Sequence, residues 1–380
     1  MKRIGICCST WNPPHVGDCR MVQSAFSALS LDEIYVIPEP ENAKLCAETQ
    51  HRLQMLWLCF SEDPRVVITK EEEADRLSCV KSAAKKIAQE CPETEIVYFL
   101  GVADFLSYGS RWLETTVPLA VIGQPDNRDR AAFEELRLRF EVAGVLLHYV
   151  DEKLECVSSA DILRMLTFRC ADEYLPPKVA GYIQWHGLYD TQKNLRHLQP
   201  DALESAVISL LKPNRVKHVL GCRDTAIQLA RHWGADETDA ARAGLLHDVT
   251  KALDAPKQLT LCYSYGIVLD DFSKKYPKTL HALTGALIAQ RLFGENEAVV
   301  SAIRWHTTGK ANMTLLEKII YVADYMEPNR DFPGVEQLRR LAFEDLDGAL
   351  KLGLEMTIAV LKEQGSEISP ASQEALQWLI

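Results

Sequence analysis

The spacing of apolar residues along the sequence changes near residue 190, and this change constrains the fold more than any other feature. Up to about residue 150, short β-rich runs alternate with amphipathic stretches. The runs are RIGICC, EIYVIP, RVVIT, EIVYFLG, VPLAVIG and GVLLHYV. Such alternation predicts a doubly wound parallel sheet with helices on both faces. A helical tail follows as far as Tyr189, and the Pro176–Pro177 pair should divide it into two helices.

The sequence after about residue 202 has helical periodicity throughout and contains no run that predicts a strand. We therefore expect an α/β plus all-α protein with two domains, residues 1–192 and 203–380, on either side of the segment DTQKNLRHLQPD. Two domains also suit a chain of 380 residues, because a single hydrophobic core rarely extends beyond about 250–300 residues.

Composition excludes several classes of partner. The net charge of −11 argues against a general nucleic-acid or acidic-membrane surface. The apolar runs are too short to span a membrane, and the N-terminus becomes polar too early for a signal peptide. The cysteines show no C-x-x-C spacing and indicate reduced thiols. We expect a cytoplasmic protein without nucleic-acid or membrane partners. Because the chain is acidic, it must neutralise any phosphate ligand locally, with a metal or with a few well-placed basic side chains.

The dipeptide His247–Asp248 stands near the end of a helical segment rich in alanine and leucine. Adjacent helix positions point about 100° apart, so one interpretation is simply a helix that ends in polar residues. The alternative is a metal site, because other helices supply further imidazoles and a second carboxylate on or beside their apolar faces. The candidate ligands are His218, His247, Asp248, His281, His306 and Asp324.

Histidine and aspartate side chains that point into one helical bundle indicate a catalytic metal centre. A ligand set without cysteine suits iron, manganese or zinc and argues against a structural zinc site. Six ligands exceed what one ion with open positions needs, so one ion and two ions, with Asp248 as the bridge, both stay open. Two ions bridged in this way suit the hydrolysis of phosphoesters or phosphoanhydrides.

The pattern His…His-Asp…His…His…Asp resembles that of the HD-domain phosphohydrolases. The segments AGLLHDVTK, AIRWHTTG, LLEKIIYVADYMEPNRDFPGVEQLR and EISPASQEALQWL are similar to the YqeK family of symmetrical diadenosine tetraphosphate hydrolases, over about residues 203–380. The resemblance implies hydrolysis of the tetraphosphate bridge by metal-activated water, which releases two ADP. It also implies iron as the metal and a homodimer.

Residues beside the ligands are candidates for contacts with the substrate. Asp248 and Lys251 are the expected catalytic residues, and Lys251 would contact phosphate oxygens or stabilise the leaving group. For each of these candidates the alternative is an exposed loop or a surface charge. The expected substrate-binding residues are Thr307, Thr308, Gly309, Lys310, Arg330 and Asp331.

The first strand leads into CCSTWNPPHVGD, and a turn of this kind before a helix is a frequent phosphate site. The stretch resembles G-G-T-F-D-P-P-H-x-G-H, the signature of nucleotidyltransferases, specifically the nicotinate mononucleotide adenylyltransferases. The segments GVADFLSYGSRW and VSSADILR extend the resemblance over about residues 1–189. The nucleotide-binding residues that it implies are Thr10, His15, Lys44, Asp104, Trp112, Ser158 and Ser159.

The signature has several departures in this chain. Cys8 and Ser9 replace the two leading glycines, and Asp18 replaces the second histidine. In the I-S-S-T-x-I-R motif, Ala160 and Leu163 occupy the threonine and arginine positions. Because adenylyl transfer depends on positioning and on cations that stabilise phosphate charge, we expect this domain to be catalytically weak or repurposed.

Three functions fit these sequence features. The leading hypothesis is a metal-dependent dinucleoside polyphosphate hydrolase with a degenerate nucleotidyltransferase domain. The second is a bifunctional enzyme that also makes deamido-NAD from nicotinate mononucleotide and ATP. The third is a hydrolase whose first domain binds a nucleotide without turnover and regulates the second.

Overall fold

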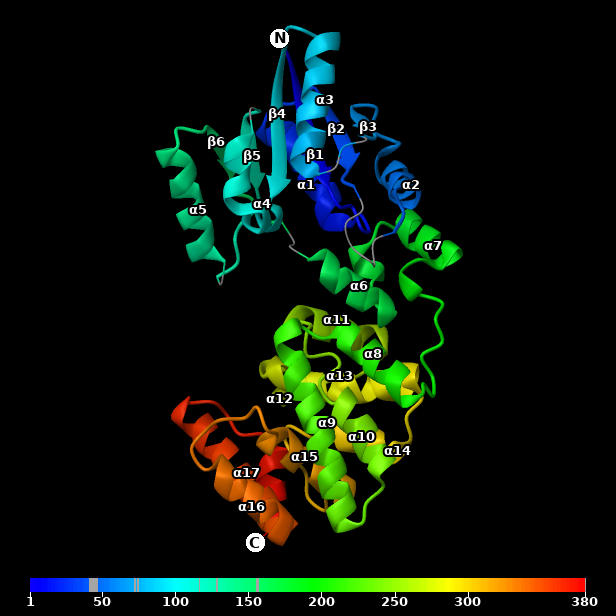
Figure 1. Ribbon diagram of the computed structural model, residues 1–380, viewed down its shortest axis with the longest axis vertical. Helices are drawn as coiled ribbons and strands as arrows, with labels where there is room; N and C mark the ends of the chain where they lie inside the picture. The colour runs from blue at the N-terminus through cyan, green and yellow to red at the C-terminus, as the bar shows by residue number, and fades with distance from the viewer. Residues whose placement is uncertain are drawn as a thin grey trace. The chain divides into compact units, whose positions relative to one another are not determined.

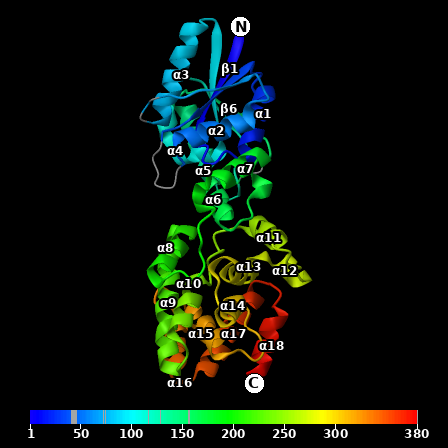
Figure 2. The same cartoon turned by 90° about the vertical axis from the view of Figure 1, so that its right-hand side faces the viewer.

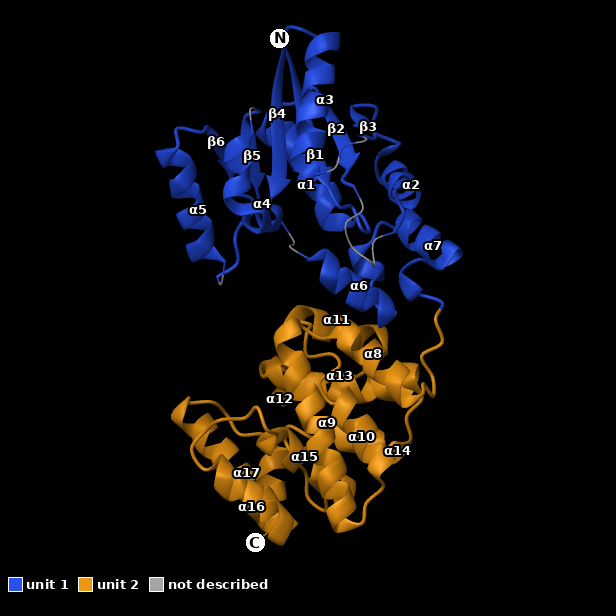
Figure 3. Cartoon of the chain, viewed as in Figure 1, with its two compact units in different colours: residues 1–192 blue, residues 193–380 orange. Residues whose placement is uncertain are grey.

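The computed structural model describes residues 1–40, 47–71, 73, 75–115, 117–127, 129–154 and 157–379. The chain divides into two compact units, residues 1–192 and 193–380 (Figure 3). No helix in the described ranges is long and apolar enough to cross a membrane.

Unit 1 is built on a six-stranded parallel sheet with the order β3-β2-β1-β4-β5-β6 (Figure 1). Every strand coincides with one of the β-rich runs of the sequence. The strands are β1 (Lys2–Ser9), β2 (Glu33–Pro38), β3 (Val66–Ile68), β4 (Thr94–Gly101), β5 (Leu119–Ile122) and β6 (Leu147–Val150). The helices are α1 (Val16–Ala28), α2 (Thr49–Phe60), α3 (Arg76–Glu90), α4 (Val102–Tyr108), α5 (Arg130–Val142), α6 (Ser159–Thr167) and α7 (Pro177–His186).

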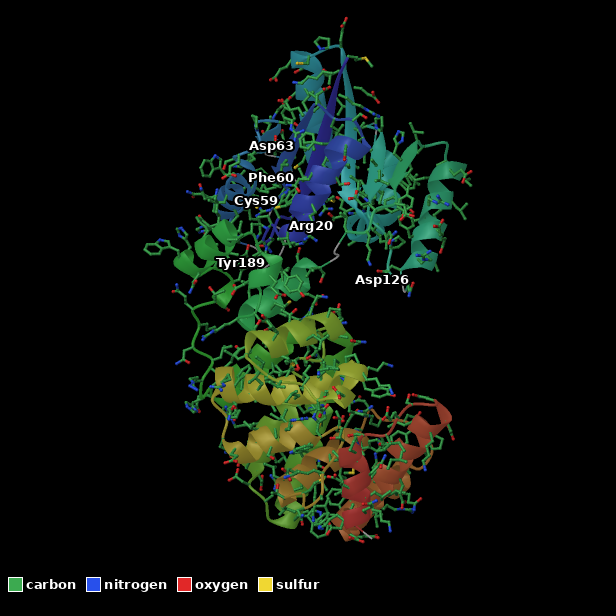
Figure 4. The ribbon with its side chains drawn as sticks, turned by 180° about the vertical axis from the view of Figure 1, so that it is seen from behind. Arg20, Cys59, Phe60, Asp63, Asp126 and Tyr189 are labelled. Atoms are coloured by element: carbon green, nitrogen blue, oxygen red, sulfur yellow. The ribbon has the colours of Figure 1, made fainter. Side chains whose placement is uncertain are left out.

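Helices cover both faces of the sheet, which explains why its strands are apolar without alternation. Successive residues of β4 point to opposite faces. Tyr98 and Leu100 pack with α3, α4 and α5, whereas Val97 and Phe99 pack with α1 and α2. Figure 4 marks Phe60, the last residue of α2, which belongs to this second layer.

The winding of the sheet reverses between β1 and β4, because the chain moves outward from β1 in both directions. Ligands of open α/β sheets bind at the carboxyl edge at such a point. Ser9 ends β1, His15 precedes α1, and Asp104 lies in the first turn of α4 directly after β4. The topology therefore brings the predicted nucleotide-site residues His15 and Asp104 to one edge, together with Ser9.

Unit 2 is helical, with no strand among its described residues (Figure 2). Its helices are α8 (Pro200–Leu210), α9 (Pro213–Trp233), α10 (Glu237–Leu246), α11 (Ala255–Ser264), α12 (Asp271–Lys275), α13 (Leu280–Ile288), α14 (Glu297–Trp305), α15 (Leu315–Met326), α16 (Val335–Glu344), α17 (Leu346–Glu363) and α18 (Pro370–Trp378). Residues before 203 already pack on this unit. The His197 amide donates to the Phe293 carbonyl, and Arg242 donates to the Leu198 carbonyl.

A close crossing of α9 and α10 brings two parts of the candidate site together. A Cβ on Gly244 of α10 would lie 2.7 Å from the Cα of Arg223 in α9. Only glycine permits this approach, since real side chains do not pack so near a backbone. The crossing places His218 of α9 beside His247, the residue that follows α10.

Candidate metal centre and nucleotide site

The predicted metal ligands converge in the core of unit 2. They come from five helices or their ends: His218 from α9, His247 and Asp248 after α10, His281 from the first turn of α13, His306 after α14 and Asp324 from α15. All but Asp324 are buried, and the Asp324 side chain is only 15% exposed. Polar side chains seldom gather in a helical core unless they bind one another or a cation.

Asp248 lies between two pairs of histidines. The Nε2 atoms of His218 and His247 are 3.2 Å apart, and those of His281 and His306 are also 3.2 Å apart. Oδ2 of Asp248 is 3.7 Å from His218 Nε2 and 3.5 Å from His247 Nε2. Oδ1 of Asp248 is 3.4 Å from His281 Nε2 and 3.8 Å from His306 Nε2. Each oxygen of this carboxylate thus faces one histidine pair.

Asp324 adds a second carboxylate on one side only. Its Oδ1 atom is 3.1 Å from His218 Nε2 and 3.8 Å from His247 Nε2. We call His218, His247, Asp324 and Oδ2 of Asp248 the first half-site. His281, His306 and Oδ1 of Asp248 form the second half-site, in which the three ligand atoms lie within 4.8 Å of one another.

Hydrogen bonds on the outer nitrogens fix the orientation of the imidazoles. Three Nδ1 atoms donate to the carbonyl oxygen three residues earlier, at 2.7–2.8 Å. These pairs are His247 with Gly244, His281 with Lys278 and His306 with Ile303. The fourth, His218 Nδ1, is 3.1 Å from Oε1 of the buried Glu327. Since these partners accept hydrogen bonds, the Nε2 lone pairs point inward as ligands.

The convergent acceptors fit a divalent metal. Oδ1 of Asp248 is buried and has no hydrogen-bond partner among the described residues, although a buried carboxylate oxygen without a partner is costly. A bound cation would satisfy the imidazole lone pairs and this oxygen together. Imidazole nitrogen with carboxylate oxygen is a donor set that iron, manganese and zinc accept.

Protonation states largely match those that a metal needs. Burial lowers the pKa of His306 to about 4, and burial together with Lys251 holds the pKa of His281 well below its ordinary value. Burial opposes ionisation of Asp248, but His247 and Lys251 hold its pKa well below the usual range. His247 differs, because nearby acidic groups outweigh burial and raise its pKa. A bound cation would displace that proton.

Three basic side chains surround the ligand set. Arg215 Nε donates to Asp248 Oδ2 at 2.6 Å, and Arg330 Nη2 donates to Asp324 Oδ1 at 2.7 Å. Lys251 Nζ lies 2.8 Å from Nε2 of His281. Lys251 and Arg330 were predicted from the sequence, whereas Arg215 and Glu327 were not. The available signal was spacing, because Arg215 lies one helical turn before His218 and Glu327 lies three residues after Asp324.

The predicted substrate-binding residues separate into two groups. Thr307 directly follows a ligand, and its hydroxyl is buried with no partner in the described ranges; Arg330 also touches a ligand. The other predicted residues have different partners or are exposed. Lys310 Nζ is 3.1 Å from Oε1 of the buried Glu317, the Thr308 hydroxyl donates to the Gly309 carbonyl, and Asp331 is exposed. The position of Lys310 is therefore explained by its ion pair with Glu317 and does not require a contact with substrate.

At the sheet edge of unit 1, Asp18 and His15 lock each other in place. The His15 amide donates to Asp18 Oδ2 at 3.0 Å, and the Asp18 amide donates to His15 Nδ1 at 3.3 Å. This reciprocal capping box stabilises the start of α1. Nε2 of His15 also lies 3.4 Å from Asp18 Oδ2. The aspartate in the position of the second signature histidine therefore holds the first one.

A buried arginine occupies the neighbouring position at the same edge. Arg76 Nε donates to Glu39 Oε2 at 2.6 Å, and Arg76 Nη1 is 2.9 Å from Asp104 Oδ1. The Ser9 hydroxyl donates to Asp104 Oδ2 at 3.0 Å. Two carboxylates thus share one guanidinium, which leaves little positive charge for a triphosphate. Asp104 was predicted at this edge from the sequence, whereas Arg76 and Glu39 were not.

The remaining predicted residues of unit 1 lie in several environments. Trp112 is fully buried, its ring packs against those of Tyr98 and Tyr108, and its Nε1 has no hydrogen-bond partner among the described residues. A contact between this indole and a nucleotide stays a prediction. The Thr10 carbonyl accepts a hydrogen bond from the buried Arg52.

The two serines and the lysine complete the set. Ser158 caps α6 by accepting from the Asp161 amide, and Ser159 is the first residue of that helix. Arg164, which neighbours the missing motif arginine, pairs with Asp161 at 3.0 Å. Lys44 lies outside the described residues.

Comparisons with known proteins identify both units. The HD domain family matches residues 215–329, and the cytidylyltransferase-like family matches residues 6–165. The symmetrical bis(5'-nucleosyl)-tetraphosphatase of Halalkalibacterium halodurans is 42% identical over 43% of this chain and 89% of its own length. A probable nicotinate-nucleotide adenylyltransferase of Aeromonas hydrophila is 31% identical over 49% of this chain and 96% of its own length. A probable nicotinate-nucleotide adenylyltransferase/Ap4A hydrolase of Mycoplasma pneumoniae is 25% identical over 93% of this chain and 98% of its own length. The chain therefore belongs, in its C-terminal part, to the HD-domain family of the symmetrical bis(5'-nucleosyl)-tetraphosphatases, joined to an N-terminal unit of the cytidylyltransferase-like family.

Proposed function

We propose that unit 2 is a metal-dependent hydrolase that cleaves diadenosine tetraphosphate symmetrically. The observation that carries this proposal is the position of Asp248, whose two oxygens face two separate histidine pairs. One shared carboxylate between two imidazole pairs suits a pair of cations, and paired cations suit hydrolysis of phosphoanhydrides. The tetraphosphatase relative supports the choice of substrate.

We propose iron as the resident metal, in both half-sites. A bound divalent cation supplies positive charge that polarises a phosphoryl group and activates water. Hydrolysis between the two central phosphorus atoms breaks one P–O bond, consumes one water and yields two ADP. The chain's own cations then have a defined role: Arg215, Lys251 and Arg330 neutralise phosphate oxygens around the cleaved bond, and the buried Thr307 hydroxyl donates to one of them.

Product analysis tests this proposal directly. The full chain, loaded with iron(II) or manganese(II), is mixed with diadenosine tetraphosphate, and the nucleotides are separated by chromatography while bound metal is measured. Symmetrical cleavage gives ADP as the only early product. Equal amounts of AMP and ATP, or no turnover by a protein that holds two metal equivalents, would contradict the proposal. Light scattering on the same sample tests the homodimer that we propose with it.

For unit 1 we propose a repurposed nucleotidyltransferase fold without adenylyl transfer. The support is the pairing of His15 with Asp18 and of Arg76 with both Glu39 and Asp104, since this imidazole and this guanidinium each already have a carboxylate partner. Binding without turnover would make this unit a nucleotide sensor. Calorimetric titration with ATP, nicotinate mononucleotide and deamido-NAD measures such binding.

A bifunctional enzyme is the second candidate, and one observation favours it. The relative from Mycoplasma pneumoniae, which matches this chain over 93% of its length, bears a name that combines both activities. Incubation of the full chain with nicotinate mononucleotide and ATP separates the two candidates, because only the bifunctional enzyme releases pyrophosphate and deamido-NAD.

A further inference from the structure

The loop that follows α15 contacts the first half-site through two side chains. Oε1 of Glu327 is 3.1 Å from Nδ1 of His218, and Arg330 donates to Oδ1 of Asp324 at 2.7 Å and to the Asp324 carbonyl at 2.9 Å. Both contacts depend on the backbone between residues 326 and 330. Among the described residues, His281 and His306 of the second half-site have no hydrogen bond or ion pair with this loop.

Glu327 has a tightly defined position. Its Oε2 accepts hydrogen bonds from the Asn329 amide at 2.7 Å and from Asn329 Nδ2 at 2.8 Å. The carboxylate lies against the backbone of α9, where a Cβ on Gly221 would be 2.5 Å from Oε2. Glu327 therefore reaches His218 only while the loop backbone stays in this conformation and position 221 has no side chain.

One guanidinium from the next helix holds that backbone. Arg339 of α16 donates from Nε to the Met326 carbonyl at 2.9 Å. Its Nη2 donates to the carbonyls of Glu327 and Arg330, at 2.9 and 2.8 Å. The last carbonyls of a helix have no partner within the helix, and the rigid fork of arginine is suited to bind several acceptors at once. Within the described ranges, Arg339 has no hydrogen bond or ion pair with a predicted ligand.

We propose that Arg339 is a positioning residue for the first half-site, acting through Glu327 and Arg330. With Arg339 in place, the loop presents Glu327 to His218 Nδ1, so that Nε2 of this imidazole faces the metal; it also presents Arg330 to Asp324. The inference rests on the metal-binding part of the proposed function and needs no assumption about the substrate.

The experiment compares Arg339→Ala and Arg339→Lys with Arg340→Ala in the full chain. Arg340 is the adjacent, exposed residue of the same helix, so its removal changes the net charge equally. Metal content per chain and dissociation constants for manganese(II) are measured by competition with a chelator, without substrate. The same measurements in a His281→Ala background report the first half-site alone.

We expect Arg339→Ala to weaken metal binding at the first half-site by up to about 10–100-fold, the usual effect of losing an outer partner of a metal ligand, which here is Glu327. The second half-site should keep its affinity. Arg339→Lys should recover only part of the loss, because an ammonium group cannot span the three carbonyls, and Arg340→Ala should match the unmodified chain. Gly221→Ala, which displaces Glu327 while leaving Arg339 intact, should reproduce the selective loss.

Equal affinities in Arg339→Ala and Arg340→Ala would overturn the proposal. So would an equal loss at both half-sites, which would indicate a general role in stability. If Arg339→Ala does not fold, Arg339→Lys and Gly221→Ala decide, and unchanged affinity in both rejects the inference. An unmodified chain that binds metal but leaves diadenosine tetraphosphate intact would refute the proposed function without touching this result.

Discussion

Replacing Asp248 with asparagine tests whether one carboxylate serves both histidine pairs. Asparagine keeps the size of the side chain and one oxygen, but its NH2 group has no lone pair to offer a metal. The oxygen should turn toward Arg215, which donates to Oδ2 in the present structure. The NH2 group would then face His281 and His306. We expect Asp248→Asn to bind at most one cation per chain, in the first half-site.

The expected magnitudes follow from the contacts that change. A hydrogen bond to a charged group contributes about 1.5–3 kcal/mol and a neutral one about 1 kcal/mol, so the Arg215 contact loses roughly 1 kcal/mol. For a unit of this size that lowers the melting temperature in chelator by about 2–4 °C. Metal charge at a phosphoryl group contributes several kcal/mol to catalysis, and a loss of about 4 kcal/mol slows turnover roughly a thousandfold.

The assay combines metal analysis, thermal melting in chelator and ADP release from diadenosine tetraphosphate. Asp271→Asn is the matched control, because it removes the same charge from a fully exposed side chain of α12 in the same unit. The control should keep two metal equivalents and full turnover. An Asp248→Asn protein that holds two equivalents and turns over at more than a tenth of the normal rate would refute the bridging role.

Three further predictions concern the separate units. Residues 193–380 expressed alone should fold, bind metal and hydrolyse the dinucleotide, because all six ligands lie in that range; a fragment that gains metal and activity only when unit 1 is added would contradict this. Removal of metal by a chelator should destabilise unit 2 and leave unit 1 unchanged. The expected loss of unfolding free energy is about 2.7 kcal/mol if the free metal concentration had been 100 times the dissociation constant. Calorimetry of the full chain measures both transitions, and a shift of the unit 1 transition would indicate metal in that unit. The unmodified chain should form no deamido-NAD from nicotinate mononucleotide and ATP. The triple variant Asp18→His, Ala160→Thr, Leu163→Arg should lower the activation barrier of adenylyl transfer by about 2–4 kcal/mol for each restored donor. Robust synthesis by the unmodified chain that is lost in His15→Ala would instead establish the bifunctional enzyme.

Local patterns were enough to predict the elements and to select the six polar side chains that meet in the core of unit 2. The strands of unit 1 are continuous apolar runs because both faces of the sheet are covered, so each was visible without knowledge of its neighbours. The histidines of unit 2 stand on or beside apolar helix faces, which indicates inward orientation. That all these faces meet in one core follows from the small number of ways in which short helices bury their apolar sides.

Contacts between distant residues were not predictable in this way. Arg215 and Asp248 are 33 residues apart, and Glu327 and His218 are 109 residues apart. An arginine or glutamate on a helix has the same local pattern whether it faces solvent or supports a ligand. The burial of Trp112 was also not predictable, because an aromatic residue in a motif has the same local sequence pattern in a core as in a binding site.

The balance of charge explains why phosphate chemistry is expected in unit 2 rather than at the sheet edge of unit 1. In unit 1, the cation Arg76 is shared by Glu39 and Asp104, so a polyphosphate there would compete with fixed carboxylates and meet their repulsion. In unit 2, Arg215 and Arg330 are also held by carboxylates, but those carboxylates belong to the ligand set. Divalent cations in the half-sites would neutralise them, and the guanidinium groups would then face a substrate that carries the opposite charge. We therefore expect metal binding and phosphate binding to be coupled in unit 2, so that a polyanion binds there only after a metal.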